Sequence, residues 1–200
     1  MPDFPHPNRF LAHYGDACAD TLGRLGDLFD EMARHYAAVA EAYGFHCEGC
    51  ADNCCRTRFF HHTLVEFLML HRGVAALTEE ARASAMGRAA KEGKSAVGAD
   101  SGLMRVWCPL AEDGRCMIYD CRPMICRLHG LPHELRHPVR GVVQGPGCAA
   151  FDAACGGRIY RRLDRTPLYR RMAELEQSLR QATGFDGRIR MTVAEMVRRF

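Results

Sequence analysis

The chain of 200 residues and 22.4 kDa is long enough for one ordinary domain, and its composition is that of a globular protein. Hydrophobic residues make up 48% of the sequence and charged residues 26%, which excludes extensive disorder and low-complexity structure. The formal net charge of +3 is too small to indicate a nucleic-acid or anionic-membrane partner, and no apolar run is long enough to span a bilayer.

The N-terminal sequence predicts an irregular arm followed by a long helix. Residues 1–19 are rich in proline at their start and show no apolar stretch typical of a secretory signal, so we expect a cytoplasmic protein. From position 20 onward, apolar residues recur at steps of three and four and form one helical stripe: Leu22, Leu25, Leu28, Met32, Tyr36, Val39 and Tyr43. Gly44 suits the left-handed conformation that ends such a helix.

Two further helices are predicted before the middle of the chain. A capping-box pattern at Thr63 predicts a helix that continues to about Arg72. Thr78 and the two acidic residues after it predict an alanine-rich helix that continues to about Lys91. Residues 92–107 contain several glycines and are expected to form a loop.

The second half of the chain is predicted to contain one small β-hairpin and three helices. The Asp-Gly pair at 113–114 lies between two short apolar pieces, a pattern typical of a hairpin turn. Residues 123–130 begin with proline and end with glycine, which favours a short helix. An amphipathic helix is predicted over 167–184, and a second capping box opens a terminal helix over 192–200.

Cysteine is the unusual feature of the composition. The chain has 11 cysteines, an odd number, and without an export signal the thiols should be reduced. Four of them lie close together at Cys47, Cys50, Cys54 and Cys55. The spacing from Cys47 to Cys50 aims two sulfur atoms at one ion. Adjacent Cys54 and Cys55 point in different directions, so the pair is better suited to two metals or to a cluster with several irons.

A second cysteine group follows about fifty residues later. Cys108, Cys116 and Cys126 belong to it, with Cys121 between them and Cys148 beyond. These residues place four or five thiols on one hairpin-and-helix unit. Because neither short segment can bury a core alone, we expect the two groups to converge on one metal site.

Together these patterns predict a mainly α fold. We expect a single compact helical domain with cysteine-rich loops and a small β-hairpin around a metal site. Its parts would be an irregular arm over 1–19, a cysteine-cluster metal-binding region over 20–165 and C-terminal helices over 166–200 that pack on the same domain.

Cationic and imidazole side chains accompany both cysteine groups. Arginines beside the cysteines would offset the negative charge of bound thiolates: Arg56, Arg58, Arg122 and Arg127. Trp107 and Tyr119 are expected to pack around the site and exclude water. Four histidines that follow the two groups are candidates for an additional ligand or proton donor: His61, His62, His129 and His133.

The cysteine pattern resembles that of a known family. It consists of Cys47-x2-Cys50-x3-Cys54-Cys55, then Cys108-Pro-Leu and Gly114-Arg-Cys116-x-Ile-Tyr119-x2-Arg122-Pro123-x2-Cys126-Arg127. Over residues 47–148 the chain is similar to the YkgJ-type CxxCxxCC cysteine-cluster family, which is described as zinc- or iron-chelating. The resemblance therefore implies a metal site. The first motif departs from the family pattern by one residue, because three residues separate Cys50 from Cys54.

The predicted metal ligands are Cys47, Cys50, Cys54, Cys55, Cys108, Cys116, Cys126 and Cys148. Cys121 lies outside the family motif. Cys18 has no thiol nearby in the sequence, and Cys155 lies in a run of small residues. We expect these three cysteines to be small apolar side chains of the core or spare thiols.

The nature of the metal and the function remain open at this point. The second group lacks the C-x2-C spacing of structural zinc sites, which favours an iron–sulfur cluster, 4Fe-4S above all, over Zn²⁺. Three functions fit: a redox or sensing iron–sulfur protein, a structural-zinc protein-interaction module, and a cluster-dependent methyltransferase-like enzyme. The last rests on a similar cysteine motif in flagellin lysine methylases, which are linked to an iron–sulfur cluster. We expect a protein or redox partner, and no catalytic residue is identified.

Overall fold

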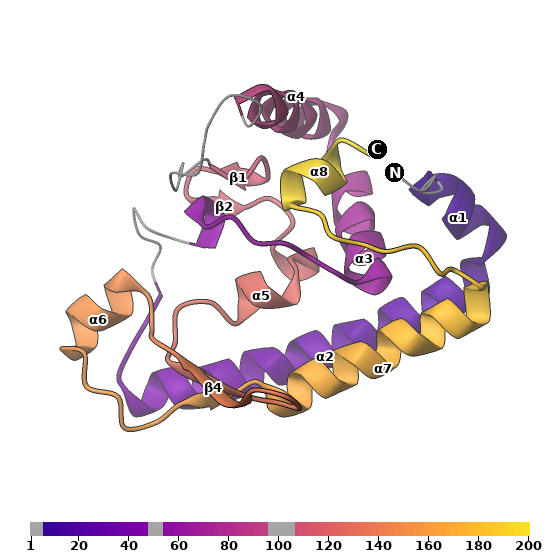
Figure 1. The fold of residues 1–200 in the computed structure, drawn as a ribbon. Helices are drawn as coiled ribbons and strands as arrows, with labels where there is room; N and C mark the ends of the chain where they lie inside the picture. The colour runs from indigo at the N-terminus through magenta and orange to yellow at the C-terminus, as the bar shows by residue number, and fades with distance from the viewer. Residues whose placement is uncertain (1–5, 48–53, 96–106) are drawn as a thin grey trace.

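The computed structural model describes residues 6–47, 54–95 and 107–200 and is mainly helical (Figure 1). It confirms the predicted fold class, including the small β-hairpin. The elements are, in chain order, α1 (Pro7–His13), α2 (Gly15–Ala42), the 3-10 turn η1 (Cys54–Arg56), α3 (Leu64–Ala75), α4 (Glu79–Ser95), β1 (Ala111–Glu112), β2 (Arg115–Cys116), the 3-10 turn η2 (Tyr119–Cys121), α5 (Met124–Arg127), β3 (His133–His137), β4 (Gly141–Gly145), α6 (Ala149–Cys155), β5 (Leu163–Asp164), α7 (Thr166–Thr183) and α8 (Val193–Val197).

Helices α2 and α7 lie side by side and run in opposite directions (Figure 1). The stripe predicted for α2 is buried, and Leu25, Leu28 and Met32 have no exposed surface. In α7, Leu168 and Leu179 are equally buried, with exposed fractions of 0% and 1%. Each such side chain contributes about 1.5–3 kcal/mol by leaving water. The rest of the molecule packs against this pair of helices.

Helix α3 lies between the α2–α7 pair and the α4–α8 pair (Figure 1). Its residues are buried on nearly all sides, among them Leu64, Phe67 and Leu70 with no exposed surface. A helix that is apolar all round belongs in the interior. The predicted start is confirmed, because the Thr63 hydroxyl accepts a hydrogen bond from the Glu66 N–H at 3.4 Å.

The predicted hairpin is present between β1 and β2. Asp113 and Gly114 both have positive φ, at 48° and 75°, the combination that a tight two-residue hairpin turn requires. In the register of the hairpin, Ala111 pairs with Cys116. The hairpin therefore brings Cys116 back beside the start of its own strand pair, close to Cys108.

The sheet β4–β3–β5 and helix α6 are not among the predicted elements. Strand β3 pairs with β4 in antiparallel and with β5 in parallel orientation. Nearly every residue of β4 is exposed, so its sequence lacks the alternation by which a half-buried strand is recognised. The pairing of β3 with β5 joins residues about thirty positions apart, which no local pattern reveals.

The expectation of an irregular arm over 1–19 is wrong for the described part of that segment. Residues Pro7–His13 form α1, and α2 begins at Gly15. Pro7 occupies the first turn, where its missing N–H costs no hydrogen bond, and the His6 ring accepts from the Asn8 N–H at 3.3 Å. Proline near the start of a segment thus marked a helix beginning and not a break.

Other boundaries differ by a few residues from the prediction. Helix α4 continues to Ser95, so it includes the start of the loop predicted over 92–107, while residues 96–106 lie outside the described part. Gly44, just after α2, has a φ of 60°, which is the left-handed conformation predicted for the end of this helix. Helix α8 ends at Val197 and does not reach the last residue, although its capping box is present.

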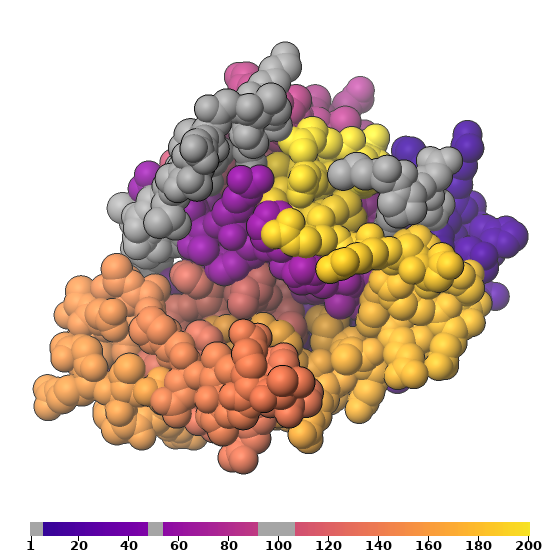
Figure 2. All heavy atoms as spheres, in the orientation of Figure 1, coloured from indigo at the N-terminus to yellow at the C-terminus, as the bar shows by residue number. Residues whose placement is uncertain are grey.

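The segment after η1 pairs with the C-terminal segment through two buried residues. His61 and Met191 exchange two backbone hydrogen bonds, at 2.8 and 3.0 Å, and form an isolated antiparallel bridge. Figure 2 shows the purple stretch that follows η1 in contact with the yellow C-terminal part of the chain on this face. The bridge ties the first cysteine segment to the end of the molecule.

Candidate metal centre

The two cysteine groups meet at Cys55 and Cys108. The Cys108 N–H donates a hydrogen bond of 2.6 Å to the Cys55 carbonyl oxygen. Cys54 and Cys55 belong to η1, whereas Cys116 and Cys126 are carried by β2 and α5. Segments that are far apart in the sequence therefore converge, as predicted.

The sulfur atoms of η1 interact with each other. The Cys55 thiol donates to the Cys54 sulfur, which lowers the pKa of Cys54 to about 6 and raises the pKa of Cys55. Arg122 lowers the pKa of Cys54 further, while the charges of Cys108 and Cys116 raise that of Cys55. Cys54 is thus the sulfur that this environment most readily ionises.

The cysteines of β2 and α5 face the same place. Burial is the main reason why the pKa of Cys126 lies well above its ordinary value, and Cys54, Cys108 and Cys116 raise it further. The pKa of Cys116 is also raised, first by burial. Several thiolates at close range repel one another, so they can ionise together only beside a cation. A bound metal would supply that cation and take the thiolates as ligands.

A second side of the centre contains Tyr36, Cys47 and Cys148. Burial and the neighbouring charges of Cys47, Cys148 and Cys54 raise the pKa of the Tyr36 hydroxyl, so this group of α2 lies among the cysteines. Cys148 is fixed by its N–H, which donates to the Gly130 carbonyl oxygen at 2.9 Å. Through Cys54, this side joins the group formed by η1, β2 and α5.

Gly130 leaves the space that this arrangement needs. Its φ of 111° suits glycine, and a Cβ there would lie 2.9 Å from the Tyr36 Oη and 3.8 Å from the Cys148 Sγ. Gly130→Ala should therefore lower the free energy of unfolding by about 2 kcal/mol or more in urea titrations, from backbone strain and displacement of the Tyr36 hydroxyl.

A matched control separates strain from crowding in this experiment. Gly141 also has positive φ, at 69°, but no atom lies within 4 Å of its added Cβ. Gly141→Ala should consequently cost only the strain. Equal losses for the two variants would show that the Tyr36 hydroxyl does not restrict the space at Gly130.

Cys121 faces a different part of the molecule. A Cβ added at Gly73 of α3 would lie 2.7 Å from the Cys121 Cβ and 3.2 Å from its Sγ, so η2 and α3 are in close contact here. The charged groups that affect the pKa of Cys121 are Arg72, Arg127 and Asp120. Its neighbourhood is therefore that of a packing residue between two helices.

Two of the predicted arginines lie beside the cysteines. Both Arg122 and Arg127 lower the pKa of Cys116. The Arg122 guanidinium lies 3.8 Å from the centre of the Tyr119 ring, whose side chain is 56% exposed. Tyr119 thus supports Arg122 and does not exclude water from the site, contrary to the prediction.

The other two arginines stack on aromatic rings. Arg56 lies 5.1 Å from the centre of the Trp107 ring, and Arg58 lies 5.7 Å from that of Phe60. Trp107 is 46% exposed, so it too forms part of the surface.

The candidate histidines differ in their surroundings. His61 is 2% exposed, and burial lowers its pKa to about 4, whereas His62 is exposed. The ring of His129 packs against Phe59 at 5.6 Å. The Nδ1 atom of His133 lies 3.4 Å from the Leu131 carbonyl oxygen. Their part in metal binding stays a prediction.

Glu66 is a buried residue of the site that the sequence did not single out beyond its capping role. Its Oε1 accepts a hydrogen bond of 2.9 Å from the N–H of Met124, the first residue of α5, and its Oε2 accepts one of 2.6 Å from the Thr63 hydroxyl. Glu66 thereby holds the helix that carries Cys126, and its charge affects the pKa of that thiol.

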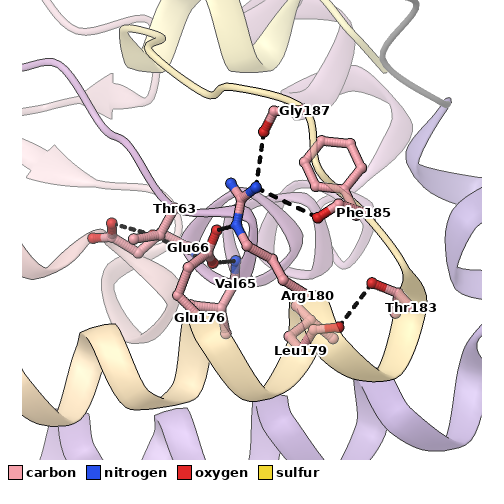
Figure 3. Close-up of polar contacts among 9 residues, drawn as sticks. All are labelled: Thr63, Val65, Glu66, Glu176, Leu179, Arg180, Thr183, Phe185 and Gly187. Carbon is pink, nitrogen blue, oxygen red and sulfur yellow. Dashed lines mark hydrogen bonds and ion pairs between the residues drawn. The ribbon is translucent and has the colours of Figure 1, made fainter.

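Helix α3 is held in turn by α7. Glu176 accepts a hydrogen bond of 3.0 Å from the Val65 N–H, and Arg180 pairs with the same carboxylate at 2.5 Å (Figure 3). Arg180 also donates to the Gly187 carbonyl oxygen at 2.9 Å. Hydrogen bonds thus connect α7 to α3 and α3 to the helix of Cys126.

The donor set fits a thiophilic metal. The centre offers soft sulfur ligands with arginines nearby, which is the chemistry of zinc and of iron–sulfur sites. Within residues 6–47, 54–95 and 107–200, no three His, Cys, Asp or Glu side chains are already placed to hold an ion. Cys50 lies outside the described residues, and the predicted ligand set of eight cysteines stays a prediction.

Comparison with known proteins gives one match. No curated protein and no solved structure matches the chain, and none of the described helices is both long and apolar enough to cross a membrane. A family model, however, matches residues 46–176, which include both cysteine groups. The chain therefore belongs to the CxxCxxCC family, described as "Putative zinc- or iron-chelating domain".

Proposed function

We propose that the chain binds a cysteine-ligated iron–sulfur cluster, of the 4Fe-4S type, and acts as a redox or sensing protein. The observation that carries this proposal is the convergence of Cys55, Cys108, Cys116 and Cys126 around Cys54. One structural zinc ion takes four ligands, usually from paired C-x2-C turns. A 4Fe-4S cluster also takes four thiolates, so the number of thiols does not distinguish it from zinc. An adjacent cysteine pair whose sulfurs point in different directions, and a second group without a C-x2-C turn, are better matched to a cluster with several irons.

The position of the centre supports exchange of electrons or signals with a partner. Cys54, Cys55 and Cys108 are only half-buried, and Cys47 is exposed. A cluster at this depth would lie close to the surface, within reach of a redox partner protein. No disulfide links the cysteines within the described residues, and a reducing compartment such as the cytoplasm would keep such thiols reduced.

Anaerobic purification followed by metal and sulfide analysis tests the proposal. We expect iron and acid-labile sulfide in equal amounts, about four of each per chain for a 4Fe-4S cluster, and visible absorption from sulfur-to-iron charge transfer. Since the ligands come from both halves of the chain, removal of iron by a chelator should lower the melting temperature of the whole molecule in one transition.

Two results would contradict the proposed iron–sulfur function. A colourless protein with stoichiometric zinc would show that the site holds structural zinc and no cluster. That result would agree with the family but not with the proposed redox role. Stoichiometric disulfides among the motif cysteines in freshly prepared anaerobic protein would contradict metal binding of either kind.

A further inference from the structure

A buried cation lies behind the cysteine centre, at the start of α7. Arg165 is 5% exposed, and its guanidinium donates a hydrogen bond to the carbonyl oxygen of Leu128, at the end of α5. Its Nε has no hydrogen-bond partner, and no carboxylate forms an ion pair with it within the described part of the chain. A buried charge without an opposite charge lowers the stability of the fold, so an anionic group near Arg165 would be stabilising.

Two tyrosine hydroxyls lie next to this cation, and the His133 ring is a further polar neighbour. Arg165 forms a hydrogen bond with Tyr169 and interacts electrostatically with Tyr36. The two tyrosines differ in what lies on their other side. Cys47, Cys148 and Cys54 surround Tyr36, whereas the charged neighbours of Tyr169 are Arg165 and Glu66.

Tyr36 therefore lies between the buried cation and the thiols. The point where a Gly130 Cβ would be is 2.9 Å from the Tyr36 Oη and 3.8 Å from the Cys148 Sγ, so both atoms border the same small space. Tyr36 comes from α2, upstream of the family-matched residues 46–176. The cysteine motif alone does not reveal it.

We propose that Tyr36 is a positioning residue of the metal centre, which donates a hydrogen bond to the Cys148 sulfur while Arg165 supplies the counter-charge behind it. The inference rests on the proposed function and adds to it a hydrogen-bond donor outside the cysteine motif. A phenol donates well to a metal-bound thiolate, and such a bond fixes the sulfur and reduces the charge that it must place on the metal. A phenol keeps its proton near neutral pH, so the hydroxyl is available as a donor.

Tyr36→Phe removes only the hydroxyl and is the direct test. The probe is Co²⁺ alone, added to metal-free protein, because its sulfur-to-cobalt charge-transfer absorption reports the thiolates. We expect affinity in chelator competition to fall about 10–100-fold, as is usual when a side chain that supports a ligand is lost. The charge-transfer band should move to longer wavelength, because the sulfur electrons are no longer stabilised by the hydrogen bond.

Tyr169→Phe is the matched control. It removes a hydroxyl that contacts the same arginine but faces no cysteine, so affinity and band position should stay those of the wild type. As a second pair, Arg165→Lys retains the counter-charge and should bind Co²⁺ more tightly than Arg165→Met. A general loss of packing would lower affinity in both tyrosine variants without moving the band.

The outcomes separate this inference from the proposed function. If the wild type binds Co²⁺ and Tyr36→Phe matches it in affinity and spectrum, Tyr36 does not donate to the centre, although the metal site stands. If the wild type binds neither Co²⁺ nor iron, both proposals are wrong.

Discussion

Cys126→Ser should lose most of the bound metal, whereas Cys121→Ser should retain it in full. Cys126 faces Cys54, Cys108 and Cys116 in the centre. A serine hydroxyl is a poor ligand for a thiophilic metal, and it leaves the remaining thiolates without a shared cation. Elemental analysis of the two purified variants, relative to protein concentration, measures the difference.

The two cysteines form a matched pair because they lie five positions apart in one segment. Cys121 packs between η2 and α3, against Gly73, so its replacement should cost only about 1 kcal/mol of folding free energy. Loss of metal in Cys121→Ser together with full metal in Cys126→Ser would reverse the assignment and show that the Arg-Pro turn presents the other thiol to the centre.

Glu66→Leu is expected to lower the free energy of unfolding by about 2–4 kcal/mol. Leucine fills a similar volume, but it leaves the buried Met124 N–H without an acceptor and removes the partner of the Thr63 hydroxyl. Since Met124 begins the helix that carries Cys126, metal retention should fall as well. Urea titration of the metal-free protein measures the first effect, and chelator competition measures the second.

Glu66→Gln is the control, because its amide oxygen can accept from the Met124 N–H and its NH2 group can donate to the Thr63 hydroxyl oxygen, without a charge. Burial raises the pKa of Glu66, so the folded protein binds this proton more tightly than the unfolded chain does. The contribution of the carboxyl is therefore complete at pH values below its ordinary pKa and declines as the pH rises above it. Relative to the Gln variant, the wild type should lose stability as the pH rises above 4.5, the ordinary pKa of the carboxyl. A wild type that gains stability relative to Gln over this range would show that Glu66 is held as a carboxylate.

Local signals in the sequence were sufficient for the hairpin and for the helices other than α1 and α6. The stripe on α2, the caps at Thr63 and Thr192 and the Asp113-Gly114 turn each depend on residues a few positions apart. Such patterns act through nearby backbone geometry, so they predict type and approximate position without knowledge of the tertiary fold.

The polar framework of the site could not be predicted in this way. Glu66 resembles an ordinary member of a capping box, yet its side chain holds the start of α5 nearly sixty residues later. Tyr36 resembles one more apolar position of a helix, and Arg165 a surface charge before a helix. Their roles depend on which elements meet in space, and only the cysteine motif carried a long-range signal that could be read from the sequence.

The pairing of α2 with α7 also sets the order of events during synthesis. At about 5–20 residues per second, the roughly 120 residues between the two helices take about 6–25 s to translate. The cysteines of both groups, from Cys47 to Cys148, are synthesised during this interval, before α7 and the cation at its start exist. Metal insertion into the complete centre therefore follows translation of α7, and until then cellular reductants must protect the emerging cysteines from oxidation.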